Sequence, residues 1–229
     1  MKILYEDHNL VAIEKPPFVP SQPDPSGDAD AMTLTREELK ARGERCELYL
    51  IHRLDRIVGG VMVFAKTKAS AATLSSLVAD GGLSKTYLAV LDGAVPASGT
   101  LEDHLIKDNA TSRAHAVPPT RRGAKLARLS YETLAVTSEG DRVRTLVRVR
   151  LETGRFHQIR IQFSVRSAPI LGDGKYGSRG RCACALFAHS LTLPAAKGER
   201  TVFALPPIES YPWSLFAEEI SSLGASYDD

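Results

Sequence analysis

One carboxylate in an unusual setting is the first candidate for chemistry. In LIHRLDRIVGGVMVFAK, residues 50–66, Asp55 lies between Arg53 and Arg56, just before the apolar run VMVFA. Burying a carboxylate is costly unless a cation pairs with it, and an arginine partner would keep it ionised at neutral pH. An ionised, positioned carboxylate can act as a nucleophile or a general base. Spacing alone favours the plainer interpretation, a salt-bridged aspartate at the edge of a strand.

A second group of candidates lies in TGRFHQIR, residues 153–160. A glycine break that leads into a helix, expected to start near Arg155, is a suitable place for a phosphate. His157 and Arg160 are three residues apart and would share one face of that helix, whereas Arg155 would point to another side. A cationic helix on the surface would show the same pattern.

Tyr87, in SKTYLAVL, is a third candidate because Lys85 precedes it by two residues. On a strand these two side chains share a face. An aromatic ring beside a cation suits stacking on a base while a phosphate is held. A core tyrosine in a strand fits the sequence at least as well.

Several other chemistries lack support in the sequence. Cys182 and Cys184 are too close together for a structural zinc site, and no second cysteine pair exists. GDGKYG does not have the arrangement of a phosphate loop, and GxGxxG is absent. The histidines also lack the local spacing of metal ligands, as is seen for His52, His104, His157 and His189. We therefore expect no metal and no nucleotide cofactor.

The elements that must position these residues indicate an α+β chain dominated by antiparallel strands. The segment Asp103–Arg128, which holds two consecutive prolines, is expected to be irregular and mobile. The first helix is expected to be capped by Thr33 or Thr35. Strands are expected within residues 2–16, 60–67, 85–93, 127–136, 141–154, 186–195 and 200–207, and helices within 32–44, 68–82 and 156–167.

Length and composition describe an ordinary globular chain. It has 229 residues, 43% of them apolar and 24% charged, which suffices for one domain with a full core. No apolar run approaches the ~18 residues of a membrane helix. The acidic N-terminal segment lacks the apolar centre of a signal peptide, and three cysteines give no disulfide framework. These features favour the reducing cytoplasm and exclude a membrane partner.

The net charge of +2 hides a strong asymmetry. Residues 105–185 hold 16 Lys and Arg against 6 Asp and Glu, a balance of +10. The rest of the chain holds 13 against 21, a balance of −8. This distribution favours a polyanionic partner for the middle of the chain, although arginines on solvated strand faces would give the same count.

Taken together and in order, the motifs resemble the RluA-type family of RNA pseudouridine synthases. The resemblance covers about residues 2–215. It rests on ILYEDHNLVAIEKPPFVPSQP, HRLD with GGVMVFAKT, KTYLAV, TGRFHQIRIQ followed by PILGDGKYG, and LFAHSLTLP. The resemblance implies a mixed, mainly antiparallel sheet with flanking helices and a central RNA-binding cleft. It also implies isomerisation of uridine to pseudouridine in RNA, without a cofactor.

The resemblance further implies roles for individual residues. Asp55 of HRLD matches the catalytic aspartate, and Arg160 of HQIR matches the basic residue that pairs with it. Tyr87 of KTYLAV matches the tyrosine that stacks on the target base and assists removal of its C5 proton. Arg53 matches an arginine that fills the gap left by the flipped nucleotide. The other expected substrate-binding residues are Arg56, Lys85, Arg155 and His157.

The sequence also departs from the family pattern. Ile57-Val58-Gly59 stands where Asp/Glu-Thr-Ser is commoner, so the threonine and serine hydroxyls are lost, and Gln162 replaces a histidine in the helix motif. The resemblance implies one catalytic domain over residues 1–229, without an N-terminal S4-type domain. It also implies a monomer that acts on an rRNA or tRNA stem-loop, recognised chiefly through residues 105–128.

Two alternatives of other classes stay open. One is a catalytically inactive RNA-binding or RNA-folding protein that keeps the same fold. The other is a glycosidase, which needs a second acidic residue placed against the first, and Asp173 in GDGKYG is the candidate. Attack of Asp55 at C1′ of the ribose or at C6 of the base is also left open.

Overall fold

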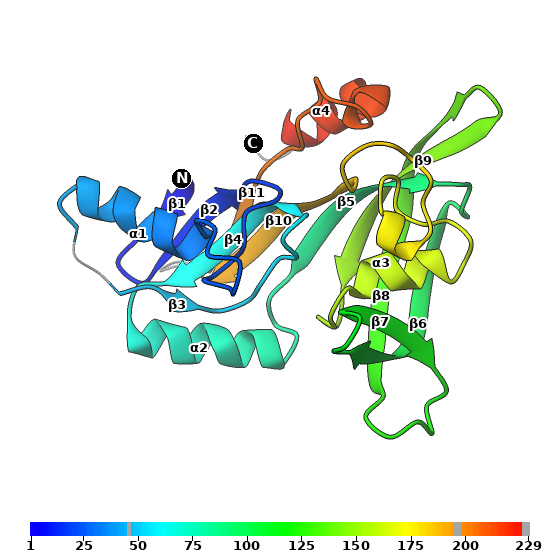
Figure 1. The fold of residues 1–229 in the computed structure, drawn as a ribbon. Coiled ribbons are helices and arrows are strands. Elements are labelled where there is room, and N and C mark those ends of the chain that lie inside the picture. The colour runs from blue at the N-terminus through cyan, green and yellow to red at the C-terminus, as the bar shows by residue number, and fades with distance from the viewer. Residues whose placement is uncertain (45–46, 195–197, 226–229) are drawn as a thin grey trace. The chain divides into compact units, whose positions relative to one another are not determined.

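A computed structural model of the chain describes residues 1–44, 47–194 and 198–225 (Figure 1). These residues form two compact units. The first unit holds Met1–Lys85 and Phe187–Pro206, and the second holds Thr86–Leu186 and the described part of Pro207–Ser226. Each unit contains its own strands, so the two are described in turn.

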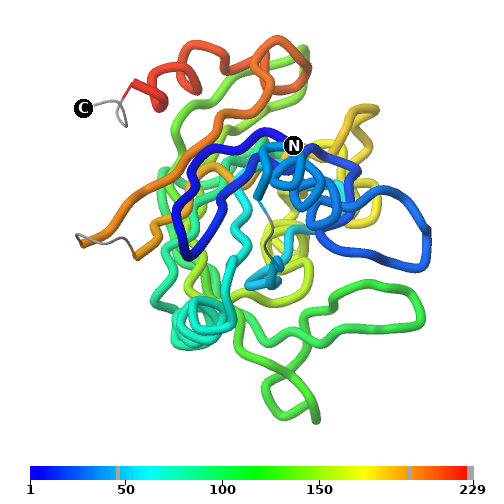
Figure 2. Tube along the Cα trace, turned by 90° about the vertical axis from the view of Figure 1, so that its left-hand side faces the viewer, coloured from blue at the N-terminus to red at the C-terminus, as the bar shows by residue number. Residues whose placement is uncertain are grey.

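The first unit contains a sheet with the strand order β1-β2-β4-β10, in which β4 and β10 are parallel and the other neighbours antiparallel. Two more strands join it, β11 beside β10 and β3 beside β4. β1 and β11 lie side by side (Figure 2), and Arg200 stacks over the ring of Tyr5 at 4.8 Å. The strands are β1 Lys2–Glu6, β2 Leu10–Lys15, β3 Tyr49–Leu50, β4 Gly59–Ala65, β10 Leu186–Pro194 and β11 Glu199–Phe203.

The apolar run after Asp55 is the centre of this sheet. All seven residues of β4 are buried, as the continuous apolar sequence GGVMVFA predicts for a strand covered on both faces. Helix α2, Lys68–Ala79, packs against β3 and β4 and begins with a capping box between Thr67 and Ser70. The prediction of a buried strand followed by a helix is therefore confirmed.

Helix α1, Ala31–Ala41, is capped by Asp30, whose carboxylate accepts a hydrogen bond from the backbone N–H of Thr33 at 3.0 Å. The expected cap at Thr33 or Thr35 is wrong, because both residues lie inside the helix. Thr35 instead donates its hydroxyl to the carbonyl of Ala31 at 2.6 Å. An aspartate caps a helix as well as a threonine does, so local preference could not choose between them.

The second unit contains strands in the order β5-β9-β8-β6-β7, in which β9 pairs with β8, β8 with β6 and β6 with β7, all antiparallel. The expectation of an irregular, mobile segment at Asp103–Arg128 is wrong, because most of it lies in β6, β7 and β8. Within this segment only Leu105, Ala114 and Ala127 are buried, and so few buried positions give no clear alternation. The strands are β5 Lys85–Asp92, β6 Ser98–Asp108, β7 Arg113–Val117, β8 Lys125–Glu139 and β9 Arg142–Leu151.

Helix α3, Gln158–Ser164, packs against β6 and β7 of the second unit. The expected helix start near Arg155 is wrong, because His157 has a left-handed backbone with φ of 52° and lies before the first turn. A core of Leu105, Ala114, Ala127, Ile161 and Tyr176 joins α3 to these strands. The remaining elements are η1 Gly174–Tyr176, η2 Trp213–Phe216 and α4 Ala217–Ala225.

The structure thus confirms an α+β fold with a mixed, mainly antiparallel set of strands and flanking helices. Among the helices of the described residues, none has the length and apolar character that crossing a lipid bilayer requires.

Candidate active site

Asp55 lies in the loop between β3 and β4, and the backbone on both of its sides is fixed. The hydroxyl of Ser21 donates to the carbonyl of Leu54 at 2.9 Å and accepts from the N–H of Leu54 at 3.1 Å. On the other side, the N–H of Val58 donates to the carbonyl of Asp55 at 2.9 Å and closes a turn. The half-buried Asp55 is therefore held by main-chain hydrogen bonds before and after it.

Two glycines end this loop, and the second of them has no room for a side chain. Gly60 has φ of +117°, and a Cβ there would lie 2.1 Å from the carbonyl oxygen of Ala188 on β10. Gly59 is also confined, since its Cβ would meet Pro17 at 3.1 Å. The loop that carries Asp55 is thus tied to β10 by a close approach of two backbones.

The two arginines that flank Asp55 in the sequence behave differently from one another. Arg56 forms an ion pair with Asp28 and lies 3.7 Å from a carboxylate oxygen of Asp24. It also donates to the hydroxyl of Ser26 at 3.0 Å. Its guanidinium is therefore committed to the loop of residues 24–28, whereas Arg53 is exposed.

Lys15 is a component of the site that the sequence reasoning missed. Its side chain is fully buried, and Nζ donates to the carbonyls of Pro16 at 2.9 Å, Val19 at 2.7 Å and Arg56 at 3.2 Å. Burial lowers the pKa of Lys15 to about 8, against the opposing influence of the Asp55 carboxylate. The ammonium thus adds positive potential beside Asp55. The signal in the sequence was a lysine at the end of a buried strand.

His52 and Lys85 also lie in this part of the first unit. Removal from water, helped by the charge of Lys85, lowers the pKa of His52 to about 3. The ring is therefore neutral at physiological pH, and its Nε2 accepts the N–H of Val63 at 3.2 Å. Burial lowers the pKa of Lys85 as well. His52 therefore carries no proton on Nε2 that it could donate at physiological pH.

The second unit holds Arg160 in a fixed orientation. Both side chains of the pair are buried, and Arg160 donates from Nε and Nη2 to the two carboxylate oxygens of Asp173, at 2.6 and 2.9 Å. Such a bidentate pair fixes the plane of the guanidinium. It also occupies both oxygens of Asp173, so this residue does not serve as the second, proton-donating acid that a glycosidase needs.

Three aromatic side chains in contact with one another lie beside Arg160. Its guanidinium lies over the ring of Tyr176, 5.0 Å from the centroid, and the Tyr176 hydroxyl is 2.8 Å from Nδ1 of His157. His157 stacks on Phe156 with ring centroids 3.8 Å apart. Burial, together with the nearby charges of Arg160 and Lys175, lowers the pKa of His157 to about 3. His157 and Arg160 do share one neighbourhood, although His157 lies outside the helix.

Three further residues have clear positions in the second unit. Tyr87 is buried on β5. The Nε of Arg155 donates to the carbonyl of Leu126 at 2.8 Å. Gln162, which departs from the family pattern, donates from Nε2 to the carboxylate of Asp103 at 2.8 Å and to backbone carbonyls of β6 and β8. The Gln162 side chain therefore links helix α3 to strands β6 and β8 by hydrogen bonds.

The described residues contain no group of three or more histidine, cysteine or acidic side chains arranged to hold a metal ion.

Comparisons with known proteins identify the class. The family model for RNA pseudouridylate synthase matches residues 9–165, so the chain belongs to the RNA pseudouridylate synthase family. The expected RluA-type resemblance is confirmed. In the solved structures, the human protein RNA Pseudouridylate Synthase Domain Containing 4 has a TM-score of 0.76 and 26% identity, over 94% of this chain and 92% of that one.

Two curated relatives come from bacteria. The chain is 32% identical to the uncharacterized RNA pseudouridine synthase YhcT of Bacillus subtilis, over 77% of this chain and 58% of the relative. It is 34% identical to ribosomal large subunit pseudouridine synthase D of Escherichia coli K12, over 79% of this chain and 54% of the relative. The chain therefore spans little more than half the length of these relatives.

Proposed function

We propose that this protein is a cofactor-independent RNA pseudouridine synthase that isomerises specific uridines of rRNA or tRNA. The family match over residues 9–165 is the observation that carries the proposal. It includes the HRLD motif, and the hydrogen bonds to the backbone of Leu54 and Asp55 support a role for this loop in presenting the Asp55 carboxylate.

In this proposal Asp55 is the nucleophile. The bond from C1′ of the ribose to N1 of uracil breaks, the base turns, and a bond from C1′ to C5 forms. The C5 proton leaves and N1 takes up a proton, so the product is an isomer of the substrate. Asp55 attacks either C1′ or C6, and both routes begin from the ionised carboxylate. The ammonium of Lys15, which lies beside Asp55, favours that form.

The other roles follow from the motif positions. Tyr87 stacks on the target base and assists proton removal from C5, and Arg160, held in plane by Asp173, supports the catalytic carboxylate. Extrusion of the base from its stack costs a few kcal/mol, which base stacking and phosphate contacts offset. The residues assigned to substrate binding are Arg53, Arg56, Lys85, Arg155 and His157.

The wider organisation is part of the same proposal. The chain acts as one catalytic domain, as a monomer in the cytoplasm, on a stem-loop of rRNA or tRNA. The positive balance of residues 105–185 supports RNA as the partner. Most of the segment 105–128 is strand, so recognition by it involves a sheet edge and the 118–124 connection.

The test is pseudouridine mapping across total RNA from cells with and without the gene. Deletion is expected to remove one or a few sites, which wild type restores and Asp55→Ala does not. Asp80→Asn is the matched control, because it removes an exposed carboxylate of the same unit, at the end of α2, and leaves Asp55 and its flanking arginines unchanged. RNA affinity of Asp55→Ala should stay close to wild type.

Other outcomes assign other functions. If deletion changes no site, or if Asp55→Ala restores every site, the protein acts as a binding protein and Asp55 is not the nucleophile. Release of free uracil from purified protein and RNA would instead indicate a glycosidase.

A further inference from the structure

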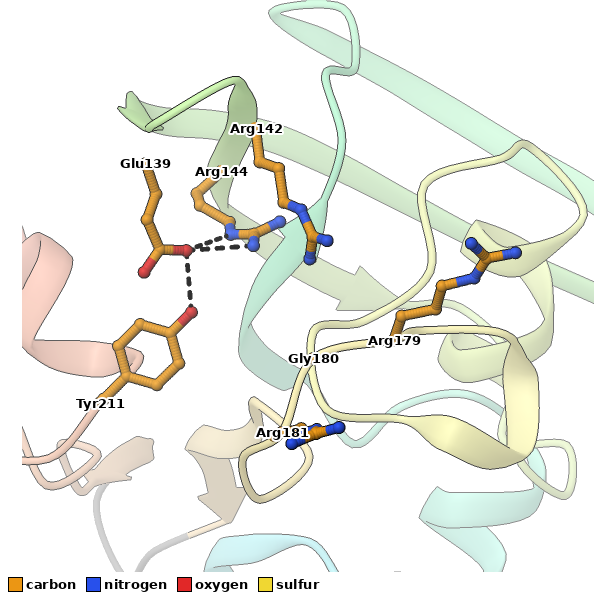
Figure 3. A pocket seen from close by; sticks show the side chains of 7 residues that line it. All are labelled: Glu139, Arg142, Arg144, Arg179, Gly180, Arg181 and Tyr211. Carbon is orange, nitrogen blue, oxygen red and sulfur yellow. Dashed lines mark hydrogen bonds and ion pairs between the residues drawn. The ribbon is translucent and has the colours of Figure 1, made fainter.

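A pocket of about 420 Å³ in the second unit carries four arginines (Figure 3). Arg142 and Arg144 come from the start of β9, and Arg179 and Arg181 come from the loop after η1. The other residues that line the pocket are Glu139, Gly180 and Tyr211. None of the arginines belongs to the motifs that identify the family.

One arginine supports the pocket, and the other three face solvent. Arg144 is 2% exposed and forms ion pairs with Asp92 and with Glu139, the latter at 3.0 Å. Glu139 also accepts the hydroxyl of Tyr211 at 2.9 Å, so both acids are committed to the frame of the pocket. Among the described residues, the three remaining arginines have no acidic partner within 4.0 Å; they are Arg142, Arg179 and Arg181.

The charge of the pocket is therefore unbalanced. Four arginines face two acids, Glu139 and Asp92, which leaves a formal balance of +2. Three exposed guanidiniums around one hollow repel each other, and an anion relieves that repulsion. Arginine forks match the oxygens of a phosphate in a bidentate manner.

The loop that carries Arg179 and Arg181 is anchored rather than loose. The hydroxyl of Ser178 donates to Asp92 at 3.2 Å and accepts from the N–H groups of Gly172 at 3.1 Å and Gly180 at 3.2 Å. Asp92 is also the partner of Arg144. One carboxylate thus ties both arginine-bearing segments together, so the site is formed before any ligand binds.

We propose that this pocket binds a phosphodiester of the RNA substrate, at a nucleotide other than the target uridine. The inference rests on the proposed function, because that function supplies the RNA. The volume accommodates a phosphate with its sugar, and the half-exposed ring of Tyr211 borders it. A phosphate contact of this kind fixes the register of the RNA without reading its sequence.

The test measures how RNA affinity depends on salt for Arg179→Gln, Arg181→Gln and the double variant, with a uridine-loop RNA hairpin as the probe. Each lost phosphate contact lowers the slope of log K against log salt by about 0.7–0.9. At 0.1 M salt this corresponds to about 5- to 8-fold weaker binding for each contact. The turnover number at saturating RNA should stay at the wild-type value.

Arg148→Gln is the matched control. It removes the same charge from β9, the strand that carries Arg142 and Arg144, but Arg148 lies outside the pocket lining and is already paired with Glu132 at 2.5 Å. Its salt slope should match wild type. Inorganic phosphate, added at constant ionic strength, tests whether the pocket also binds a free anion. It should compete with RNA for the pocket in wild type and lose that effect in the double variant.

Each outcome bears on one claim. An unchanged slope in the double variant overturns the pocket proposal, even if inorganic phosphate binds there, because the pocket would then serve a free anion. If the slope falls as expected but wild type makes no pseudouridine, the proposed reaction fails and the phosphate site stands. If wild type binds no RNA, both proposals fail.

Discussion

Strands β4 and β10 approach each other closely at the end of the loop that carries Asp55. The variant Gly60→Ala tests this close backbone contact. A Cβ at position 60 would lie 2.1 Å from the carbonyl oxygen of Ala188 and 2.6 Å from its nitrogen, whereas real Cβ contacts stay beyond 3.0 Å. The backbones would therefore have to separate by about 0.9 Å. The parallel pairing spans only Phe187 with Gly59 and Ala188 with Gly60, so this separation breaks it.

The cost follows from two effects. The positive φ of residue 60 costs about 1–3 kcal/mol for alanine, and each hydrogen bond lost from the pairing adds about 0.5–1.5 kcal/mol. We expect the free energy of unfolding to fall by about 3 kcal/mol in total. For a chain of this size, that lowers Tm by about 6–12 °C.

Gly27→Ala is the matched control for this experiment. Gly27 also has a positive φ, +74°, but no atom lies within 4 Å of its Cβ position. We expect a loss of about 1 kcal/mol, or about 2–4 °C in Tm. Thermal and urea unfolding of both variants measure the difference. If Gly60→Ala unfolds at the same temperature as Gly27→Ala, the close backbone approach behind Asp55 is wrong.

Three further predictions concern single groups. Lys15 has a folded pKa of about 8, below its ordinary 10.5, so between these values the native state releases a proton that the unfolded chain keeps. Wild-type stability relative to Lys15→Met should therefore rise by up to about 3 kcal/mol as pH increases through that window, and a flat difference in urea unfolding would refute it. Tyr176→Phe should cost about 1–3 kcal/mol, measured by denaturant midpoint, because the buried N–H of Ala114 loses its 2.7 Å acceptor. Asp30→Ala should cost about 1 kcal/mol through loss of the α1 cap, and a midpoint equal to wild type would contradict the capping contact.

Much of the fold could be predicted from local patterns. The apolar run of β4, the two strands around the turn at residues 7–9 and the helix that follows Thr67 appear in the structure as expected. The strands of 98–117 could not be found in this way, because their residues are mostly polar and half-exposed. They form strands because β8 pairs with β6 and helix α3 packs against β6 and β7. Both of these partners are distant in the sequence.

The site, like the fold, could be predicted from the sequence only in part. Short motifs in a fixed order identified the family and selected Asp55, Tyr87 and Arg160, and their roles stay predictions. The one signal for Lys15 was its place at the end of a buried strand, and only the structure shows that carbonyls at residues 16, 19 and 56 hold its charge.

Residue types at fixed spacing along the chain were enough to predict the family, the α+β class and the candidate nucleophile. Which charges are neutralised depends on the folded structure. Arg56 is bound by the 24–28 loop, and Arg144 is bound by an aspartate 52 residues away. Arg142, Arg179 and Arg181 come from separate segments and leave one hollow positively charged. An ion pair depends on distance in space, and spacing in the sequence does not determine that distance.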